Sequence, residues 1–249
     1  MVNVILFDLD GTLLPMDTEA FVENYIKELA PQVAHIVDPN LFVKSLWAGT
    51  QAMVQNKDRT KTNEQVFEET FLSLIPVEKE HIWPTLDLFY RDVFPTFSHL
   101  STPTPLAKDV VEQAIDQGYR VAVATNPVFP KAAIEHRIEW AGLSHIPFEL
   151  VTVYEESVYT KPHVEYYESI CEVLGVDPRD CVMVGNDKQE DMSASETGMK
   201  TYLVEGNVID RGEPSFRIDD QGTLEQFYDD LKNEKGIFQV KGVETGERY

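Results

Sequence analysis

Short apolar segments alternate with amphipathic segments along much of the chain. The apolar segments carry almost no charge, which is typical of strands buried on both faces of a parallel sheet. They lie at residues 4–7, 119–124, 148–153, 181–184 and 200–204. Apolar positions at helical spacing predict helices at residues 106–117, 130–141, 164–174 and 191–197. Because strands and helices alternate, we predict a Rossmann-like α/β core with a doubly wound parallel sheet.

The segment at residues 17–99 has helical periodicity, many aromatic residues and almost no strand pattern. Four helices are predicted there, at residues 18–30, 41–55, from 62 onward and 78–90. Thr62 and Gln65 have the spacing of a capping box at the start of the third. We therefore predict an inserted α-helical domain with a small core of its own. The sheet domain is then formed by residues 1–16 and 100–249.

The tail at residues 205–249 is acidic and rich in glycine. Thr223 and Gln226 form a second capping-box pattern, which predicts a short helix at residues 224–232. From Gly236 the sequence fits either a short strand or a loose end. The tail carries no pattern that indicates chemistry.

Composition and charge narrow the class of protein. The chain has 249 residues, of which 43% are hydrophobic, enough for one large domain or two small ones. Its net charge of −22 disfavours nucleic acid and anionic membranes as partners, since both attract cationic surfaces. Cys171 and Cys181 are too few for a disulfide framework, so we expect free, buried thiols. With no membrane-length apolar run and no basic start, we expect a cytoplasmic monomer or homodimer.

Residues 4–14, VILFDLDGTLL, place two carboxylates at the end of the first predicted strand. Asp8 ends the strand, Asp10 lies two residues further on, and Gly11 gives the backbone freedom for a tight turn. Ligands of open α/β sheets bind beyond the carboxyl ends of the strands. Two close carboxylates repel each other unless a cation or a shared proton offsets them, and oxygen ligands suit Mg²⁺. Alone, a simple Asp-Gly turn explains these residues equally well.

Polar residues also follow the later predicted strands. Thr125 and Asn126 stand at the end of the strand at 119–124, where a hydroxyl and an amide can bind phosphate oxygens. Lys161 precedes a predicted helix and adds its charge to the helix dipole, which favours an anion. Oxygen side chains after the strand at 181–184 can complete a metal site. These are Asn186, Asp187 and Asp191.

Each of these groups has an ordinary structural explanation. Thr-Asn before a proline is common turn chemistry, a lysine is commonly a solvated surface residue, and acidic residues commonly cap helices. Four such groups at successive strand ends form a stronger joint signal than any one of them.

The order of these groups, with the string DLDGTL at residues 8–13, resembles the haloacid dehalogenase-like hydrolase superfamily. The resemblance implies a role for each matching position. The nucleophile falls on Asp8, the general acid and base on Asp10, the phosphate ligands on Thr125 and Lys161, and the metal motif on residues 186–191.

The resemblance covers residues 1–16 and 100–204, and the helical segment between them is placed like the family's C1-type cap. One departure concerns the metal motif, in which the family usually has Gly-Asp where this chain has Gly-Asn. Either Asn186 ligates the metal through its amide oxygen, or Asp187 takes that role after a small backbone shift. The expected metal ligands are Asp8, Asp10, Asn186, Asp187 and Asp191.

The resemblance implies Mg²⁺-dependent hydrolysis of a phosphoric monoester, with a small phosphorylated metabolite as the substrate. Asp8 would form an aspartyl-phosphate, and Asp10 would protonate the leaving oxygen and then activate water. The cap would supply substrate contacts. Its candidates are Gln51, Lys57, Arg59 and Lys61.

Three alternatives stay open. A 2-haloacid dehalogenase shares the fold but does not need an acid at position 10. A phosphomutase would keep every one of these residues and differ only in its cap. A non-catalytic binding module would usually show gaps in the motifs, and this chain shows none beyond the change at Asn186.

Overall fold

One parallel sheet forms the centre of the molecule. A computed structural model describes residues 2–239 of the chain. Its strands lie in the order β3-β2-β1-β4-β5-β6, and all pairings are parallel. They are β1 (Val4–Phe7), β2 (Arg120–Val123), β3 (Leu150–Val151), β4 (Cys181–Gly185), β5 (Lys200–Val204) and β6 (Asp220–Gly222). The strand order reverses beside β1, as in doubly wound α/β folds, so the predicted fold class is confirmed.

The central strand β1 is buried on both faces. Val4 pairs with Arg120 of β2 on one side and with Cys181 of β4 on the other. Ile5 and Phe7 pack into one hydrophobic cluster, whereas Val4 and Leu6 pack into a second. A strand with two buried faces has no polar alternation, which explains the continuous apolar run in the sequence.

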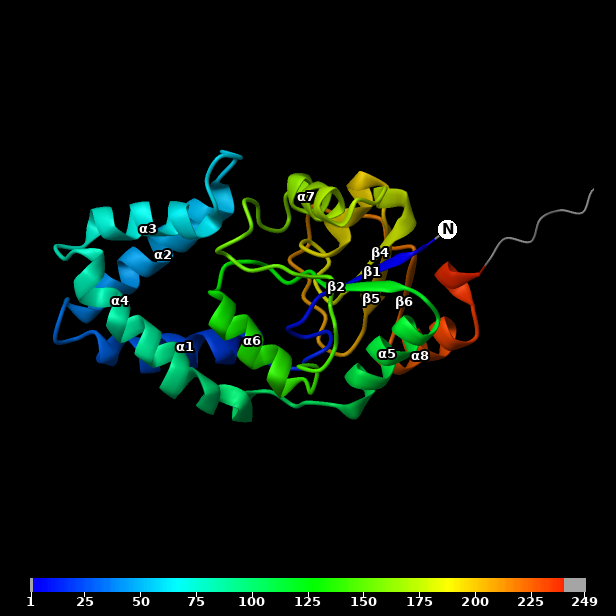
Figure 1. The fold of residues 1–249 in the computed structure, drawn as a ribbon, viewed down its shortest axis with the longest axis horizontal. Helices are drawn as coiled ribbons and strands as arrows, with labels where there is room; N and C mark the ends of the chain where they lie inside the picture. The colour runs from blue at the N-terminus through cyan, green and yellow to red at the C-terminus, as the bar shows by residue number, and fades with distance from the viewer. Residues whose placement is uncertain (1, 240–249) are drawn as a thin grey trace, which may run out of the picture.

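Helices cover both faces of this sheet (Figure 1). On one face α5 (Pro105–Asp116) packs against α8 (Leu224–Lys232). The other face is covered by α7 (Val164–Leu174) together with the 3₁₀ helix η4 (Met192–Thr197). A further helix, α6 (Lys131–Trp140), packs against the segment that joins the helical block to the sheet.

The helical block lies beyond the carboxyl ends of the strands, at the left of Figure 1. Its helices are α1 (Thr18–Gln32), α2 (Pro39–Gln55), α3 (Asn63–Leu74) and α4 (Lys79–Leu88). A π-helical turn (Phe89–Val93) and a 3₁₀ helix (Phe94–Leu100) return the chain to the sheet. Side chains at the N-cap positions Asp17, Asp38 and Thr62 accept backbone hydrogen bonds, and Thr62 forms the predicted capping box with Gln65.

The aromatic core of the helical block does not end at the block. Phe94 stacks on Trp140 of α6 with ring centres 5.5 Å apart, and Phe21 meets Phe129 edge-on at 6.4 Å. The buried residues of the block therefore belong to the same hydrophobic cluster as one face of the sheet. The core of the block is continuous with that of the sheet domain, because aromatic side chains of α6 and of the loop after β2 lie between the two parts.

Hydrogen bonds join the block to the sheet domain at two places. The first place is where the chain enters and leaves the helical block. There Met16 and Ser101 form an antiparallel bridge, and the Thr102 N–H donates to the Pro15 carbonyl oxygen at 2.8 Å. Further away, the first residue of α3, Asn63, donates its backbone N–H to the Ser157 oxygen at 2.7 Å. The block is thus held to the loops around the strand ends as well as by its covalent connections.

Some predicted elements differ in the structure. The strand predicted at 148–153 is reduced to Leu150–Val151, although the flanking Glu149 and Thr152 still donate backbone N–H groups to Val121 and Val123 of β2, each at 3.0 Å. The helix predicted at 191–197 is the 3₁₀ helix η4. Strand β6 was not predicted, because Asp-Gln-Gly has no strand preference and pairs only through its contact with β5.

The C-terminal helix α8 has the predicted bounds and the predicted Thr223–Gln226 capping box. Beyond it, Gly236–Phe238 forms a short 3₁₀ turn. The rest of the strand or loose end predicted from Gly236, at residues 240–249, lies outside the described residues.

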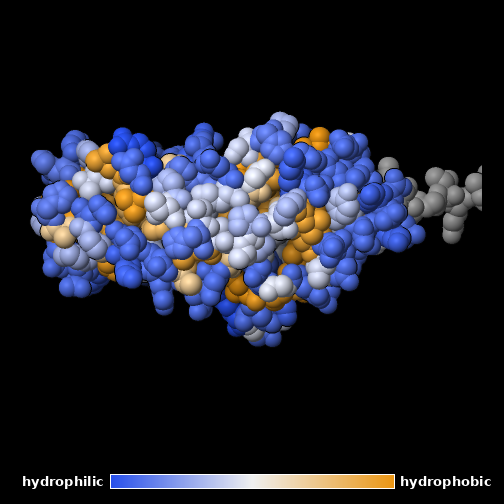
Figure 2. All heavy atoms as spheres, turned by 90° about the horizontal axis from the view of Figure 1, so that it is seen from below, coloured by the Kyte–Doolittle hydropathy of each residue, from blue (hydrophilic) through white to orange (hydrophobic). Residues whose placement is uncertain are grey.

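The surface is mostly hydrophilic on the face drawn in Figure 2, with hydrophobic residues gathered in separate patches. Within residues 2–239, no helix combines the length and the apolar character needed to span a bilayer. Cys171 and Cys181 are buried free thiols, as predicted, with sulfur atoms 3.9 Å apart.

Candidate active site

Four strand or loop ends meet at the carboxyl edge of the sheet, where its order reverses. Asp8 directly follows β1, Asn186 follows β4, and Thr125 lies two residues past the end of β2. Lys161 comes from the loop before α7 and reaches the same place. All four side chains are buried. The structure therefore brings together residues that lie up to 178 positions apart, at the place where open α/β sheets bind ligands.

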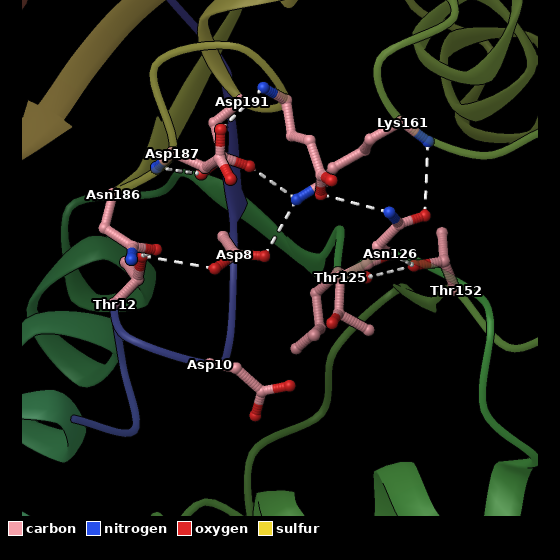
Figure 3. Close-up of polar contacts among 12 residues, drawn as sticks. Asp8, Asp10, Thr12, Thr125, Asn126, Thr152, Lys161, Asn186, Asp187 and Asp191 are labelled. Atoms are coloured by element: carbon pink, nitrogen blue, oxygen red, sulfur yellow. Dashed lines mark hydrogen bonds and ion pairs between the residues drawn. The ribbon is translucent and has the colours of Figure 1, made fainter. Parts of the chain in front are cut away.

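Lys161 holds two carboxylates at once, as the dashed lines in Figure 3 show. Its Nζ lies 2.8 Å from Asp8 Oδ1 and 2.6 Å from Asp191 Oδ1. Only 1% of the Lys161 side chain is exposed, so these pairs are shielded from solvent. Burial by itself would lower the pKa of Lys161, but the charges of Asp191 and Asp8 outweigh it and hold this pKa well above its usual value. Lys161 is therefore a permanent cation beside Asp8.

Burial has the opposite effect on the second carboxylate of this group. It raises the pKa of Asp191, against the lowering effect of the Lys161 charge, and the charge of Asp8 adds to the rise. Asp191 therefore binds a proton more readily than an ordinary aspartate does.

Thr12 links the two sides of the site. Its hydroxyl lies 3.3 Å from Asp8 Oδ2 and 3.0 Å from Asn186 Oδ1. Gly11 makes this approach possible, because it has φ +86° and a Cβ atom there would lie 2.3 Å from Asn186 Nδ2. An oxygen of Asp8 and the amide oxygen of Asn186 thus face the same small region.

The other two residues of the predicted metal motif have different partners. Both oxygens of Asp187 accept from Arg211 Nη1, at 2.8 and 2.6 Å, and Oδ1 also accepts from the backbone of Gln189 and Glu190. Asp191 uses Oδ1 for Lys161 and Oδ2 for the Asp187 N–H, at 2.9 Å. Of the three residues, Asn186 alone turns its oxygen toward the Thr12 hydroxyl that Asp8 also contacts.

The predicted phosphate ligands differ in their roles. Thr125 is buried and lines the cavity beside Asp8, and its carbonyl oxygen is fixed by hydroxyl groups of Tyr166 and Thr152, at 2.8 and 2.7 Å. Asn126 donates to Glu190 Oε2 at 3.0 Å and accepts from the Lys161 N–H at 3.3 Å. The amide of Asn126 therefore ties the loop after β2 to the loop that carries Lys161.

Asp10 is turned away from the lysine cluster (Figure 3) and pairs with Arg137 of α6. Arg137 is 2% exposed, donates from Nε to the Ala133 oxygen at 3.2 Å, and lies over the Phe129 ring at 4.7 Å. Burial raises the pKa of Asp10, against the lowering effect of the Arg137 charge. The two catalytic candidates thus have different environments, as an ionised carboxylate and a proton donor require.

Two polar atoms of this pair have no hydrogen-bond partner. They are Asp10 Oδ1 and Arg137 Nη2, both buried. Buried polar atoms are nearly always paired, so an unpaired acceptor and an unpaired donor side by side indicate a place for a polar ligand group.

The sequence did not reveal three residues of the site: Thr12, Arg137 and Arg211. Thr12 lies in the DLDGTL string, four residues after Asp8. This closeness in sequence was the signal that could have identified Thr12 as a site residue. Arg137 and Arg211 lie in segments with no other chemical pattern, and an isolated arginine is an ordinary surface residue. Only the packing of α6 and of the loop after β5 brings them to the carboxylates.

The cavity at the site has a volume of about 210 Å³. The cap candidates Gln51, Lys57, Arg59 and Lys61 do not line it. Lys61 pairs with Glu69 at 2.6 Å, and Arg59 lines a separate cavity beside α7. These polar residues lie on the loop between α2 and α3 or on exposed helix positions, so the prediction that they contact substrate finds no support in the geometry. The block reaches this cavity through Thr18 and Val22 of α1.

The charge and the donor atoms of the site fit a divalent cation. Its formal charge is −2, from the five carboxylates Asp8, Asp10, Asp187, Glu190 and Asp191 and the three cations Arg137, Lys161 and Arg211. In the described part of the chain, no three His, Cys, Asp or Glu side chains form a ready metal cluster. The candidate ligands are instead a mixed set of carboxylate and amide oxygens, which Mg²⁺ accepts.

The fold and the site define an α/β protein with buried carboxylates at the switch point of its parallel sheet. Comparison with known families agrees with this assignment. The chain belongs to the haloacid dehalogenase-like hydrolases, whose family model matches residues 2–196. This confirms the resemblance found in the sequence, and it makes the protein an enzyme of the hydrolase class.

Individual relatives are distant but span nearly the whole chain. Pyrophosphatase PpaX of Bacillus cereus strain AH820 is 23% identical over 235 residues, which are 92% of this chain and 98% of PpaX. The crystal structure of a HAD phosphatase from Thermococcus onnurineus covers 95% of this chain and 100% of its own, at 21% identity and a TM-score of 0.59. L-2-haloacid dehalogenase of Xanthobacter autotrophicus, with chloropropionic acid covalently bound, matches at 14% identity and a TM-score of 0.57, over 93% of this chain and 99% of its own. At these identities the structural matches establish the fold alone.

Proposed function

We propose that this protein is a Mg²⁺-dependent phosphatase that hydrolyses a small phosphoric monoester through an aspartyl-phosphate on Asp8. The observation that carries the proposal is the contrast between two carboxylates. Asp8 lies 2.8 Å from a buried lysine cation, whereas burial raises the pKa of Asp10 and leaves its Oδ1 without a partner. One carboxylate is suited to attack and the other to proton transfer.

In the first step, an oxygen of Asp8 attacks the substrate phosphorus and the bond from phosphorus to the ester oxygen breaks. Asp10 gives its proton to that ester oxygen, which leaves as an alcohol. Lys161 and Thr125 bind the phosphoryl oxygens as negative charge moves onto them. Arg137 holds Asp10 toward the leaving oxygen and offers Nη2 as a hydrogen-bond donor.

In the second step, Asp8 carries the phosphoryl group as an acyl phosphate and Asp10 acts as the base. Asp10, now ionised, takes a proton from water, and the water oxygen attacks the phosphorus of the aspartyl-phosphate. The bond between phosphorus and the Asp8 oxygen breaks, which releases phosphate and leaves Asp8 as a carboxylate and Asp10 protonated again. Lys161 Nζ, 2.8 Å from Asp8 Oδ1, offsets the negative charge that returns to the Asp8 oxygen as it leaves.

The residues proposed to hold Mg²⁺ are Asp8, the backbone carbonyl of Asp10, and Asn186 through Oδ1, with waters completing the shell. Bound there, the cation reduces the repulsion between the carboxylate and an anionic phosphate. The Thr12 contacts support Asn186 in this role, while the ion pairs of Asp187 and Asp191 favour a supporting role for both.

We further propose that residues 17–99 act as a C1-type cap over the core formed by residues 1–16 and 100–249. Their place beyond the carboxyl ends of the strands supports this role, because a cap there can exclude water while Asp8 attacks. A cytoplasmic location and a monomeric or homodimeric state are proposed on the composition alone.

The test is hydrolysis of p-nitrophenyl phosphate with Mg²⁺, combined with chemical trapping. Borohydride reduction of the working enzyme should convert residue 8 to homoserine, which peptide mass spectrometry detects. Asp8→Asn should lose turnover and the trapped product while its circular dichroism spectrum stays unchanged. Near-normal turnover by Asp8→Asn would refute the mechanism, and chloride release from 2-chloropropionate without phosphatase activity would identify a dehalogenase instead.

A further inference from the structure

A second cavity, of about 190 Å³, lies between the helical block and the loop after β2. Its walls come from α1, α2 and α4 of the block and from residues 128–130 of the sheet domain. The lining is largely apolar. Its aliphatic side chains include Ile26, Leu29, Leu46 and Leu86.

The side chains that line this cavity offer no positive charge to an anionic ligand. The hydroxyl groups of Tyr25 and Tyr90 bond to each other at 2.7 Å. Burial raises the pKa of Tyr25 to about 12 and that of Tyr90 well above its usual value, so both stay neutral. The one charged side chain in the lining is Asp87, which is exposed at the rim. A second phosphate or a carboxylate would find no cation there.

This cavity adjoins the catalytic cavity. Val22, Val128 and Phe129 line both of them. Phe129 packs its ring against Tyr25 at 5.3 Å on one side and under the Arg137 guanidinium at 4.7 Å on the other. Since Arg137 pairs with Asp10, the apolar cavity lies on the side of the site where the proposed leaving group departs.

We propose that this cavity binds the apolar organic group of the substrate, so that the enzyme prefers phosphate monoesters of aliphatic or aromatic alcohols. The inference rests on the proposed phosphatase function and adds the class of the leaving group. An apolar protein cavity of about 150 Å³ takes up a benzene molecule, so about 190 Å³ suits a ring or an alkyl chain of about six carbon atoms. Its enclosure by apolar side chains favours such a group over water.

The first experiment measures kcat/KM for methyl, butyl, hexyl and decyl phosphate with Mg²⁺. Burial of each methylene is worth about a fourfold gain, so hexyl phosphate should exceed methyl phosphate by at least about tenfold. The gain should stop before decyl phosphate, because the cavity is full. Equal kcat/KM values across the series would overturn the assignment of the cavity.

Two variants test whether the preference for hexyl over methyl phosphate arises in this cavity. Thr50→Trp on α2 adds bulk to its wall and should lower the hexyl-to-methyl ratio by about tenfold. Leu46→Ala enlarges it and should move the optimum to a longer chain, a gain that a misfolded protein cannot produce. The matched controls are Val173→Trp and Leu88→Ala, at positions 70% and 47% exposed and outside this cavity, and both should keep the wild-type ratio.

A binding measurement separates this inference from the proposed reaction. Calorimetry with methylphosphonate and hexylphosphonate needs no turnover. If no ester is hydrolysed, the phosphatase function fails, and the cavity is then judged by the phosphonates alone. Tighter binding of hexylphosphonate that Thr50→Trp removes supports the cavity, whereas equal affinities, or a preference that Thr50→Trp does not change, overturn it.

Discussion

The guanidinium group of Arg137 and the carboxylate of Asp10 form an ion pair across 127 positions of the chain. Arg137 is anchored on α6 by the Ala133 carbonyl oxygen and by the ring of Phe129. The pair leaves one atom of each partner unbonded, Asp10 Oδ1 and Arg137 Nη2. We infer that Arg137 is a positioning residue, which sets both the direction and the protonation of Asp10.

Arg137→Gln tests this role through the pH profile. Burial raises the pKa of Asp10 and the Arg137 charge lowers it, so removal of that charge should raise the pKa further. The first step needs protonated Asp10, and its loss of a proton sets the basic limb of kcat/KM. We therefore expect this limb to move to higher pH in Arg137→Gln, with kcat lowered by about 10- to 100-fold because Asp10 is less well oriented.

Arg137→Lys is the matched control, because it keeps a positive charge near Asp10 while losing the forked contact. Its basic limb should stay close to that of the wild type. A limb that does not move in Arg137→Gln, at intact secondary structure, would show that Arg137 does not control the protonation of Asp10.

The metal prediction concerns Asn186. Treatment with a chelator should abolish hydrolysis of p-nitrophenyl phosphate, and Mg²⁺ should restore it. Asn186→Ala removes the amide oxygen and should raise the Mg²⁺ concentration for half-maximal activity by about tenfold or more. Asn186→Asp supplies a carboxylate at the same position and should lower that concentration, since a hard cation prefers charged oxygen.

Asp210→Asn provides the control for this series. Asp210 pairs with Lys188 at the surface at 2.8 Å, so its substitution should leave the Mg²⁺ requirement unchanged. Calorimetric titration of Mg²⁺ gives a second readout that is independent of turnover. Identical Mg²⁺ affinities for wild type, Asn186→Ala and Asn186→Asp would exclude Asn186 as a ligand.

The sequence predicted the architecture well where local pattern and tertiary environment agree. Strand β1 and helix α7 have their predicted bounds, because an uncharged apolar run and a helix closed by Gly175 each carry their own signal. Strand β6 carries no such signal in its sequence, because Asp-Gln-Gly is extended only through its pairing with β5. Edge strands of this kind depend on a neighbour that the local sequence does not reveal.

The same distinction applies to the site. Asp8, Asp10, Thr125, Lys161 and Asn186 each follow a recognisable element, so topology alone predicts that they meet at one edge of the sheet. Arg137 looks like an ordinary residue near the end of a helix, and its partner is fixed only by the packing of α6 against the end of the helical block. The hydrophobic lining of the second cavity looked like the core face of four amphipathic helices.

The last prediction concerns Asn63, which joins the helical block to both loops of the active site. Its Nδ2 donates to the carbonyl oxygens of Pro127 and Tyr159, at 3.1 and 3.3 Å. Pro127 follows the Thr125–Asn126 pair, and Tyr159 lies two residues before Lys161. Asn63 is fully buried; its bond to the Pro127 oxygen is buried and its bond to the Tyr159 oxygen is partly buried.

Asn63→Ala should therefore lower the free energy of unfolding by about 1–3 kcal/mol, because it leaves buried acceptors unpaired. Asn63→Asp should be at least as destabilising although it has the same shape, since an ionised carboxylate has no donor and would face two carbonyl oxygens. Both variants should also lower kcat/KM by about tenfold or more, because small displacements of Thr125 and Lys161 spoil the geometry of attack. Urea denaturation and p-nitrophenyl phosphate kinetics measure the two effects.

Asn56→Ala supplies the comparison for Asn63. Asn56 reaches the same side of the sheet domain through a longer bond, 3.4 Å to the Val158 oxygen, and its other side-chain contacts are exposed. Water can replace these contacts, so Asn56→Ala should cost less than about 1 kcal/mol and leave kcat/KM near the wild-type value. Should Asn63→Asp unfold at the same urea concentration as the wild type, the amide of Asn63 does not donate to the loops. The block is then held to them by other contacts, among them the Asn63 and Glu64 backbone N–H groups, which donate to the Ser157 and Tyr154 carbonyl oxygens.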